Sequence, residues 1–90
     1  MYLLVNVAVL FGTPYYYFLE FFDVFRGVGY LEGGRLHDVF AVYEFEDVRR
    51  LEAVKWVFEK VYEALGYKPN SLIKVRKKIP KNFRFVKEVV

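Results

Sequence analysis

Basic side chains recur at alternate positions near the C-terminal end of the chain. Within residues 71–79, Ile73, Val75 and Ile79 share one set of alternating positions, and Lys74, Arg76 and Lys78 share the other. In a β-strand, residues two apart point to the same face, so these three cations form a row. Such a row can follow the phosphates of one nucleic-acid strand, and Lys81 and Arg84 lie close by. The other interpretation is an edge strand that lysines protect against aggregation.

Side chains suited to catalysis are few and scattered. His37 is the only histidine, and no partner for acid–base chemistry can be named for it. Asp38 and Glu44 lie six residues apart on an expected strand, roughly 20 Å, which is too far to share a metal ion. Glu46 and Asp47 are better explained as acids at a helix N-terminus. We therefore predict no catalytic residue, metal site, cofactor or small-molecule substrate, and no enzymatic activity.

Charge is distributed unevenly along the 90 residues. Residues 1–67 hold six Lys/Arg against ten Asp/Glu, a balance of −4, whereas residues 68–90 hold eight against one, a balance of +7. This asymmetry favours an anionic partner such as single-stranded RNA or DNA, although a solvated basic face is an alternative. Residues 2–19 carry no charge, but Gly12 and Pro14 interrupt the run, so we expect neither a membrane span nor a membrane partner.

The composition indicates one aromatic-rich domain covering residues 1–90. Aromatic residues make up 21% of the chain, and each can bury a large area, so a dense core is expected despite the short length. No cysteine is present, which excludes disulfides and thiolate metal sites. Residues that are labile on heating are scarce while charged residues are plentiful, as in a heat-adapted cytoplasmic protein.

The first half of the chain predicts a strand, a helix and a hairpin. Residues 2–10 would be apolar on both faces of a strand and are rich in β-branched side chains, which is typical of a central strand. Residues 15–26 favour a strand by propensity, yet Glu20, Asp23 and Arg26 recur at every third position, and Pro14 and Gly27 flank the segment, so we expect a helix that is buried on most sides. The Gly33-Gly34 pair predicts a two-residue hairpin turn between strands 28–32 and 35–45.

The second half predicts a helix followed by two strands. Asp47 is placed to cap a helix that runs to about Leu65 and ends at Gly66. Its apolar stripe consists of Val48, Leu51, Val54, Val57, Phe58, Val61 and Leu65. Residues 71–79 form the next strand. Residues 83–90 are expected either to pair with that strand as a hairpin or to be donated to a second subunit.

This order of elements predicts an α+β fold of the ferredoxin-like βαββαβ type with an extra C-terminal strand. Right-handed crossovers would place the first and third strands side by side in an antiparallel sheet, with both helices on one face. The opposite face would be left open. Ala41, Tyr43 and Phe45 would point to the helices, and Phe40 and Val42 to the open face.

Residues 38–45, Asp-Val-Phe-Ala-Val-Tyr-Glu-Phe, resemble the central-strand signature of the RNA recognition motif. Phe40, Ala41 and Phe45 match it, whereas Asp38 replaces a cation and Val42 an aromatic residue. In that family, unstacked bases lie on aromatic side chains of the first and third strands, so the resemblance implies that Phe40 stacks a base.

We therefore expect a small non-enzymatic protein that binds single-stranded RNA or DNA through its open sheet face and basic C-terminal strand. The expected nucleic-acid-binding residues are Phe40, Lys74, Arg76, Lys78, Lys81 and Arg84. The alternative is a homo-oligomeric interaction module with no nucleic-acid role. We expect a homodimer in either case, because apolar residues occupy the open face and the last strand.

Overall fold

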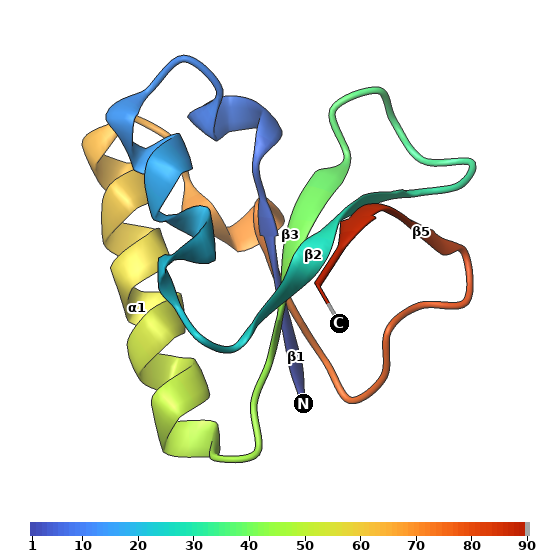
Figure 1. The fold of residues 1–90 in the computed structure, drawn as a ribbon. Coiled ribbons are helices and arrows are strands. Elements are labelled where there is room, and N and C mark those ends of the chain that lie inside the picture. The colour runs from blue at the N-terminus through green and yellow to red at the C-terminus, as the bar shows by residue number, and fades with distance from the viewer. Residues whose placement is uncertain (90) are drawn as a thin grey trace.

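The computed structural model describes residues 1–89 as an α+β protein with a five-stranded antiparallel sheet (Figure 1). The strand order is β4-β1-β3-β2-β5. The strands are β1 (Tyr2–Asn6), β2 (Phe25–Leu31), β3 (Val39–Glu44), β4 (Ile73–Arg76) and β5 (Phe83–Glu88). The helices are the α-helix α1 (Val48–Ala64) and the 3₁₀ helices η1 (Ala8–Leu10), η2 (Pro14–Phe21) and η3 (Pro69–Ser71).

Strands β1 and β3 lie side by side in the interior of the sheet, and each has a neighbour on both sides. The central position expected for the first strand is confirmed, although the strand ends at Asn6 rather than at residue 10. The faces of β3 are also as predicted. Ala41 and Tyr43 pack with the helices, whereas Phe40 and Val42 join a separate cluster on the opposite face.

Helix α1 covers one face of the sheet, and its ends are as predicted. Asp47 is the N-cap, because its side chain accepts a hydrogen bond from the Arg49 backbone N–H at 2.8 Å. Gly66 follows the helix with a φ of 88°, a left-handed conformation that glycine adopts without strain. The predicted apolar stripe is partly wrong, since Val48 and Val57 are exposed. The buried residues of the helix are Leu51, Val54, Phe58 and Tyr62.

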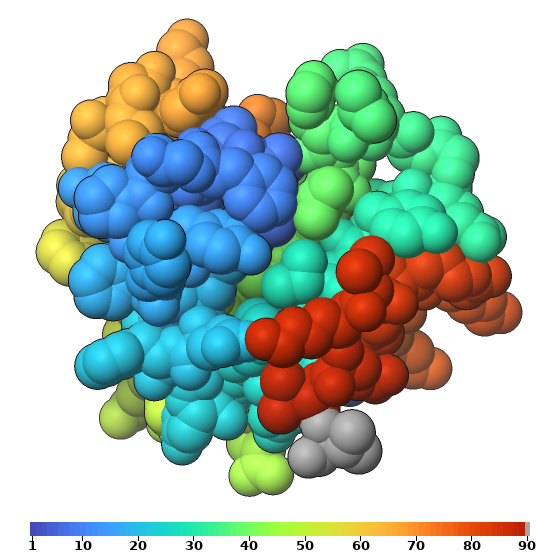
Figure 2. Space-filling model, turned by 45° about the horizontal axis from the view of Figure 1, so that its top comes forward, coloured from blue at the N-terminus to red at the C-terminus, as the bar shows by residue number. Residues whose placement is uncertain are grey.

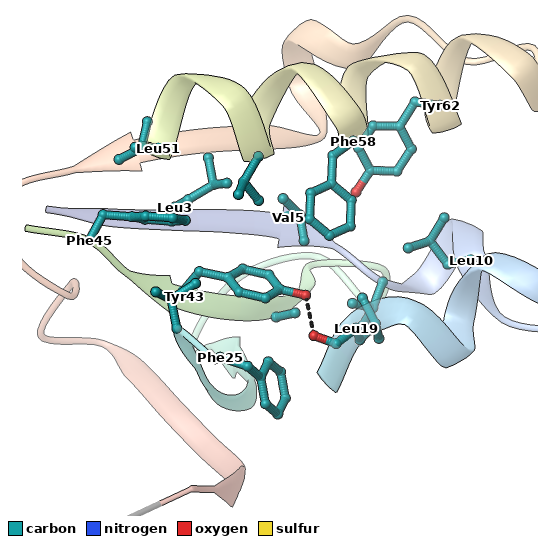
Figure 3. Packing of buried hydrophobic residues seen from close by; sticks show 14 residues of the cluster. Leu3, Val5, Leu10, Leu19, Phe25, Tyr43, Phe45, Leu51, Phe58 and Tyr62 are labelled. Atoms are coloured by element: carbon teal, nitrogen blue, oxygen red, sulfur yellow. Dashed lines mark hydrogen bonds between the residues drawn. The ribbon is translucent and has the colours of Figure 1, made fainter. Parts of the chain in front are cut away.

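The main core lies between α1, the 3₁₀ helices and the sheet (Figure 3). Leu3 and Val5 of β1 point toward α1, whereas Tyr43 of β3 points toward Leu19 of η2, and Leu10 enters from η1. The Tyr43 ring is packed against both Phe25 and Phe58, with ring centroids 5.6 and 5.5 Å away. This face of the sheet is therefore fully used by the chain itself.

The helix expected at residues 15–26 is instead the 3₁₀ helix η2, which ends at Phe21, and β2 begins at Phe25. Of the polar residues whose three-residue spacing indicated a helix, only Glu20 lies in η2, because Asp23 follows the helix and Arg26 lies in β2. Phe25 belongs to the sheet because it pairs with Tyr43 and is buried. The helical interpretation is thus right in part, and the segment is shorter and differently wound.

The prediction of a two-residue turn at Gly33-Gly34 is wrong, although β2 and β3 do pair as neighbours. The strands end at Leu31 and begin again at Val39, so residues 32–38 form a longer loop. A type I′ turn needs positive φ at both central residues, and only Gly33 has it, at 75°. The Asp38 carboxylate accepts a hydrogen bond from the Arg35 backbone N–H at 3.0 Å and stabilises the wider loop.

The last strand pairs with β2, so both predictions for it are wrong. Strands β4 and β5 are the two opposite edges of the sheet. Residues 77–82 connect them across the face opposite α1, which we call the second face. Gly29 of β2 permits this arrangement. A Cβ atom there would lie 2.2 Å from the Arg84 backbone oxygen, so only glycine lets β5 approach so closely.

No helix within residues 1–89 is long and apolar enough to cross a membrane.

Candidate nucleic-acid interface

The face that was expected to be open is closed by the chain itself. Phe40 is 1% exposed and Val42 is completely buried. Both belong to a cluster with Leu4 and Phe83, and the side chains around it are those of Tyr2, Leu31, Ile79 and Phe85. Phe83 and Phe85 come from β5, and Ile79 comes from the connection that crosses this face. A base therefore cannot stack on Phe40 while β5 is in place.

Strand β4 presents its two cations as the alternation predicts. Ile73 and Val75 pack against the main core, whereas Lys74 is on the second face, with its Nζ 5.9 Å from the centroid of the Phe40 ring. Lys74 and Arg76 pair in register with Leu4 and Tyr2 of β1. Because β4 is an edge strand, both cations stand at a border of the sheet where a long ligand has access.

The remaining predicted cations do not all join this row. β4 ends at Arg76, so Lys78 and Lys81 lie in the connection of residues 77–82 rather than on a strand, and both are exposed. Arg84 is on β5 at the opposite edge of the sheet. Its Nε is 2.9 Å from Glu32 Oε1, so its charge is already paired. The structure thus brings Lys74 and Arg76 together and separates Arg84 from them.

One run of cations near the end of β4 takes no part in the ion pairs of the described chain. In residues 1–89 the pairs are Arg26–Glu44, Arg50–Asp23, Lys60–Glu63, Arg84–Glu32 and Lys87–Glu20. None of them involves Lys74, Arg76, Lys77, Lys78 or Lys81, which we call the cationic segment. This segment follows the chain from the end of β4 into the connection, and none of its side chains forms an ion pair with a described carboxylate.

Three of the acidic side chains that could do chemistry, those of Asp38, Glu44 and Asp47, are bonded to other parts of the chain. The Asn6 side chain donates a hydrogen bond to the backbone oxygen of His37 at 2.8 Å, while the His37 side chain is exposed. Glu44 accepts from Tyr2 and Arg26, and Asp38 and Asp47 bond to backbone N–H groups. Within the described chain, no three His, Asp or Glu side chains gather closely enough to hold a metal ion.

Two buried tyrosines anchor the helices to the sheet. The Tyr43 hydroxyl donates to the Leu19 backbone oxygen at 2.7 Å, and the Tyr62 hydroxyl donates to the Asn6 backbone oxygen at 2.5 Å. Burial disfavours the charged phenolate and raises the pKa of both hydroxyls well above the ordinary value of 10.0. The role of Tyr62 was missed, although its position four residues after Phe58 is the signal that could have revealed it.

A second feature that the sequence interpretation missed is the exposure of η2. Its residues were expected to be buried on most sides, but Leu19 is the only one of them that is buried. Tyr17 is 84% exposed and Phe21 is 79% exposed. The run of three tyrosines followed by a phenylalanine is a usable signal, since one short helix cannot turn so many consecutive rings toward a single core.

Comparison with family models, curated proteins and solved structures gives no match to this chain.

Proposed function

We propose that this protein binds single-stranded RNA or DNA through the cationic segment. The observation that carries the proposal is a run of five cations, without an ion pair to any described residue, which begins on the edge strand β4 and continues along the connection of residues 77–82, while the described cations of β5 are in ion pairs. Two residues of a strand span about 7 Å, so Lys74 and Arg76 offer charges at separate points along an extended backbone. Lys77, Lys78 and Lys81 continue this charge along the chain.

The mode of binding differs from the one that the RNA recognition motif implies. Because Phe40 is covered by β5 and by Lys74, base stacking on the sheet is not accessible. Recognition then rests on phosphate contacts, which carry no sequence information. We infer that binding is tolerant of sequence and strongly dependent on salt.

The expected salt dependence follows from the number of cations. If all five contact phosphates of a single strand, the logarithm of the affinity falls with the logarithm of salt at a slope of about −3.5. Raising the salt from about 50 mM to about 200 mM then weakens binding by roughly 100-fold. Removing two contacts makes the slope shallower by about 1.4.

The test is fluorescence anisotropy with labelled single-stranded RNA and DNA of mixed sequence over this salt range. The variant Lys77→Glu/Lys78→Glu changes two exposed cations of the connection, and we expect it to weaken binding at least tenfold with a shallower salt slope. The control is Arg35→Glu/Lys60→Glu, which makes the same change of charge on the 32–38 loop and on α1. Circular dichroism checks that each variant is folded.

Two results would overturn the proposal. One is no binding by the unaltered protein at low salt. The other is an equal loss in the test and control variants, because the effect would then reflect net charge rather than the cationic segment.

We further propose that the architecture is a variant of the ferredoxin-like arrangement. The central β1–β3 pairing and the crossover through α1 support this. The addition of β5 beside β2 and the 3₁₀ winding of η2 distinguish it.

A further inference from the structure

The outer surface of the segment 11–22 is occupied by aromatic rings. Tyr17 and Phe21 are almost fully exposed, and three further rings are between 38% and 54% exposed, those of Phe11, Tyr16 and Phe18. Phe11, Tyr16 and Tyr17 form one group, with neighbouring ring centroids 5.1 and 6.0 Å apart, and Phe18 and Phe21 form a second, 6.3 Å apart. Both groups lie on the same short segment. Figure 2 shows this segment, in blue to cyan, spread over one face of the molecule next to β5 in red. We call these five residues the aromatic surface.

An apolar groove adjoins the aromatic surface, between η2 and α1. It has a volume of about 250 Å³. Its walls are apolar or aromatic side chains of η2, of the residue that follows it, and of α1, namely Tyr15, Phe18, Phe22, Val57, Phe58 and Val61. The same side of the molecule therefore carries both projecting rings and a recess that can accept a ring.

The area of the aromatic surface is large for a protein that remains alone in water. A fully exposed aromatic side chain presents roughly 200 Å², so the exposed parts of the five rings amount to roughly 600 Å². Val57, which is 41% exposed and lines the groove, enlarges this area. A standard stable interface buries about 800 Å² on each partner. Apolar patches of this size usually mark a binding surface.

The charges around the surface favour a second copy of the same chain. Glu20 and Asp23, the carboxylates closest in sequence, are already paired with Lys87 and Arg50. The surface therefore presents no unpaired carboxylate of its own to attract a charged partner. In a twofold dimer the same patch meets itself, so projecting rings of one copy can enter the groove of the other.

We propose that the protein forms a homodimer through the aromatic surface and the adjoining groove. The cationic segment takes no part in this contact, so the proposal stands or falls independently of nucleic-acid binding. Tyr17 and Phe21 are the residues expected to contribute most, because they project furthest and large aromatic side chains dominate interface energies.

The test measures molar mass by sedimentation equilibrium from micromolar to near-millimolar concentration. We expect the unaltered protein to approach twice the chain mass of 10.8 kDa. Tyr17→Glu and Phe21→Glu should each weaken association at least tenfold. The matched control is Leu36→Glu, since Leu36 is 88% exposed on the 32–38 loop and receives the same new charge. It should leave association unchanged, and circular dichroism verifies folding of all variants.

Three outcomes would overturn the dimer. The unaltered protein could remain a monomer at every concentration, or it could associate without any effect of Tyr17→Glu and Phe21→Glu, which would place the contact elsewhere. Equal weakening by Leu36→Glu would attribute the effect to charge alone. Flotation of a monomeric protein with neutral lipid vesicles would assign the aromatic surface to a membrane instead.

Discussion

Replacing Gly29 by alanine should separate β5 from the sheet. The added Cβ would lie 2.2 Å from the Arg84 backbone oxygen and 2.6 Å from Cε1 of Phe83. The first of these atoms is part of the backbone, so the clash cannot be relieved by turning a flexible side chain. Gly29 has no left-handed φ, and the substitution therefore tests close packing of two strands rather than backbone strain.

The expected loss of stability can be estimated from what β5 contributes. Forcing extra atoms into a packed site costs about 1–3 kcal/mol where the surroundings can shift. If β5 detaches, Phe83, which is only 6% exposed, loses about 2–3 kcal/mol of burial. Each broken hydrogen bond between β2 and β5 adds about 1 kcal/mol. We therefore expect Gly29→Ala to lower the free energy of unfolding by about 3 kcal/mol.

The assay is urea unfolding followed by circular dichroism, with thermal unfolding alongside. For a domain of this size, about 3 kcal/mol corresponds to a fall in Tm of roughly 12–24 °C. Amide hydrogen exchange gives a second measurement, because backbone amides of β5 should lose protection while those of α1 keep it.

Gly33→Ala is the matched control for this substitution. Gly33 has a φ of 75°, and a Cβ there would meet no atom within 4 Å. The left-handed backbone conformation is the one feature that disfavours alanine at this position, and it costs about 1–2 kcal/mol of stability. If Gly29→Ala costs no more than Gly33→Ala, or leaves exchange in β5 unchanged, the close approach of the two strands is not what requires glycine.

Two further predictions concern the buried polar groups. Asn6→Ala removes the hydrogen bonds to the His37 backbone oxygen and the Ala8 N–H and leaves both backbone groups without a partner. We therefore expect urea unfolding to show a free energy of unfolding lower by about 2–4 kcal/mol. A decrease of less than about 1 kcal/mol would contradict this. Because burial raises the pKa of Tyr43 and Tyr62 in the folded state, their contribution to stability is complete below pH 10 and declines as the pH rises further. A titration of phenolate absorbance should show two hydroxyls that ionise only as circular dichroism reports unfolding, and ionisation of all tyrosines in the folded protein would refute it.

The parts of the fold that the sequence predicted depend on local chemistry. Asp47 accepts a hydrogen bond from a backbone N–H two residues later, and Gly66 adopts a left-handed φ of 88° that its lack of a side chain permits. The two faces of β3 follow from simple alternation, which is why Phe40 and Tyr43 were assigned to the correct sides. In each case the deciding interactions lie within a few residues of one another.

The parts that were missed depend on distant contacts. The pattern of β5 shows that Phe83 and Phe85 share a side, but nothing in it specifies pairing with β2, which is about 55 residues earlier in the chain. Gly27 and Gly29 carried that information, because glycine inside a strand often marks the close approach of another backbone. The exposure of η2 was missed for a related reason, since α1 had already taken the space over the sheet.

The position of β5 also decides how any nucleic acid must be recognised. A base could reach Phe40 only in a form with β5 released. That release costs about 3 kcal/mol or more, because Phe83 loses its burial and the hydrogen bonds to β2 are broken. Such a form would be populated at less than about 1%, and affinity through it would be reduced by at least about 100-fold. The cations of β4 and of the connection need no such opening, because they are accessible with β5 in place. Stacking on Phe40 would therefore have to outweigh this penalty before it contributed to binding, whereas phosphate contacts contribute from the outset.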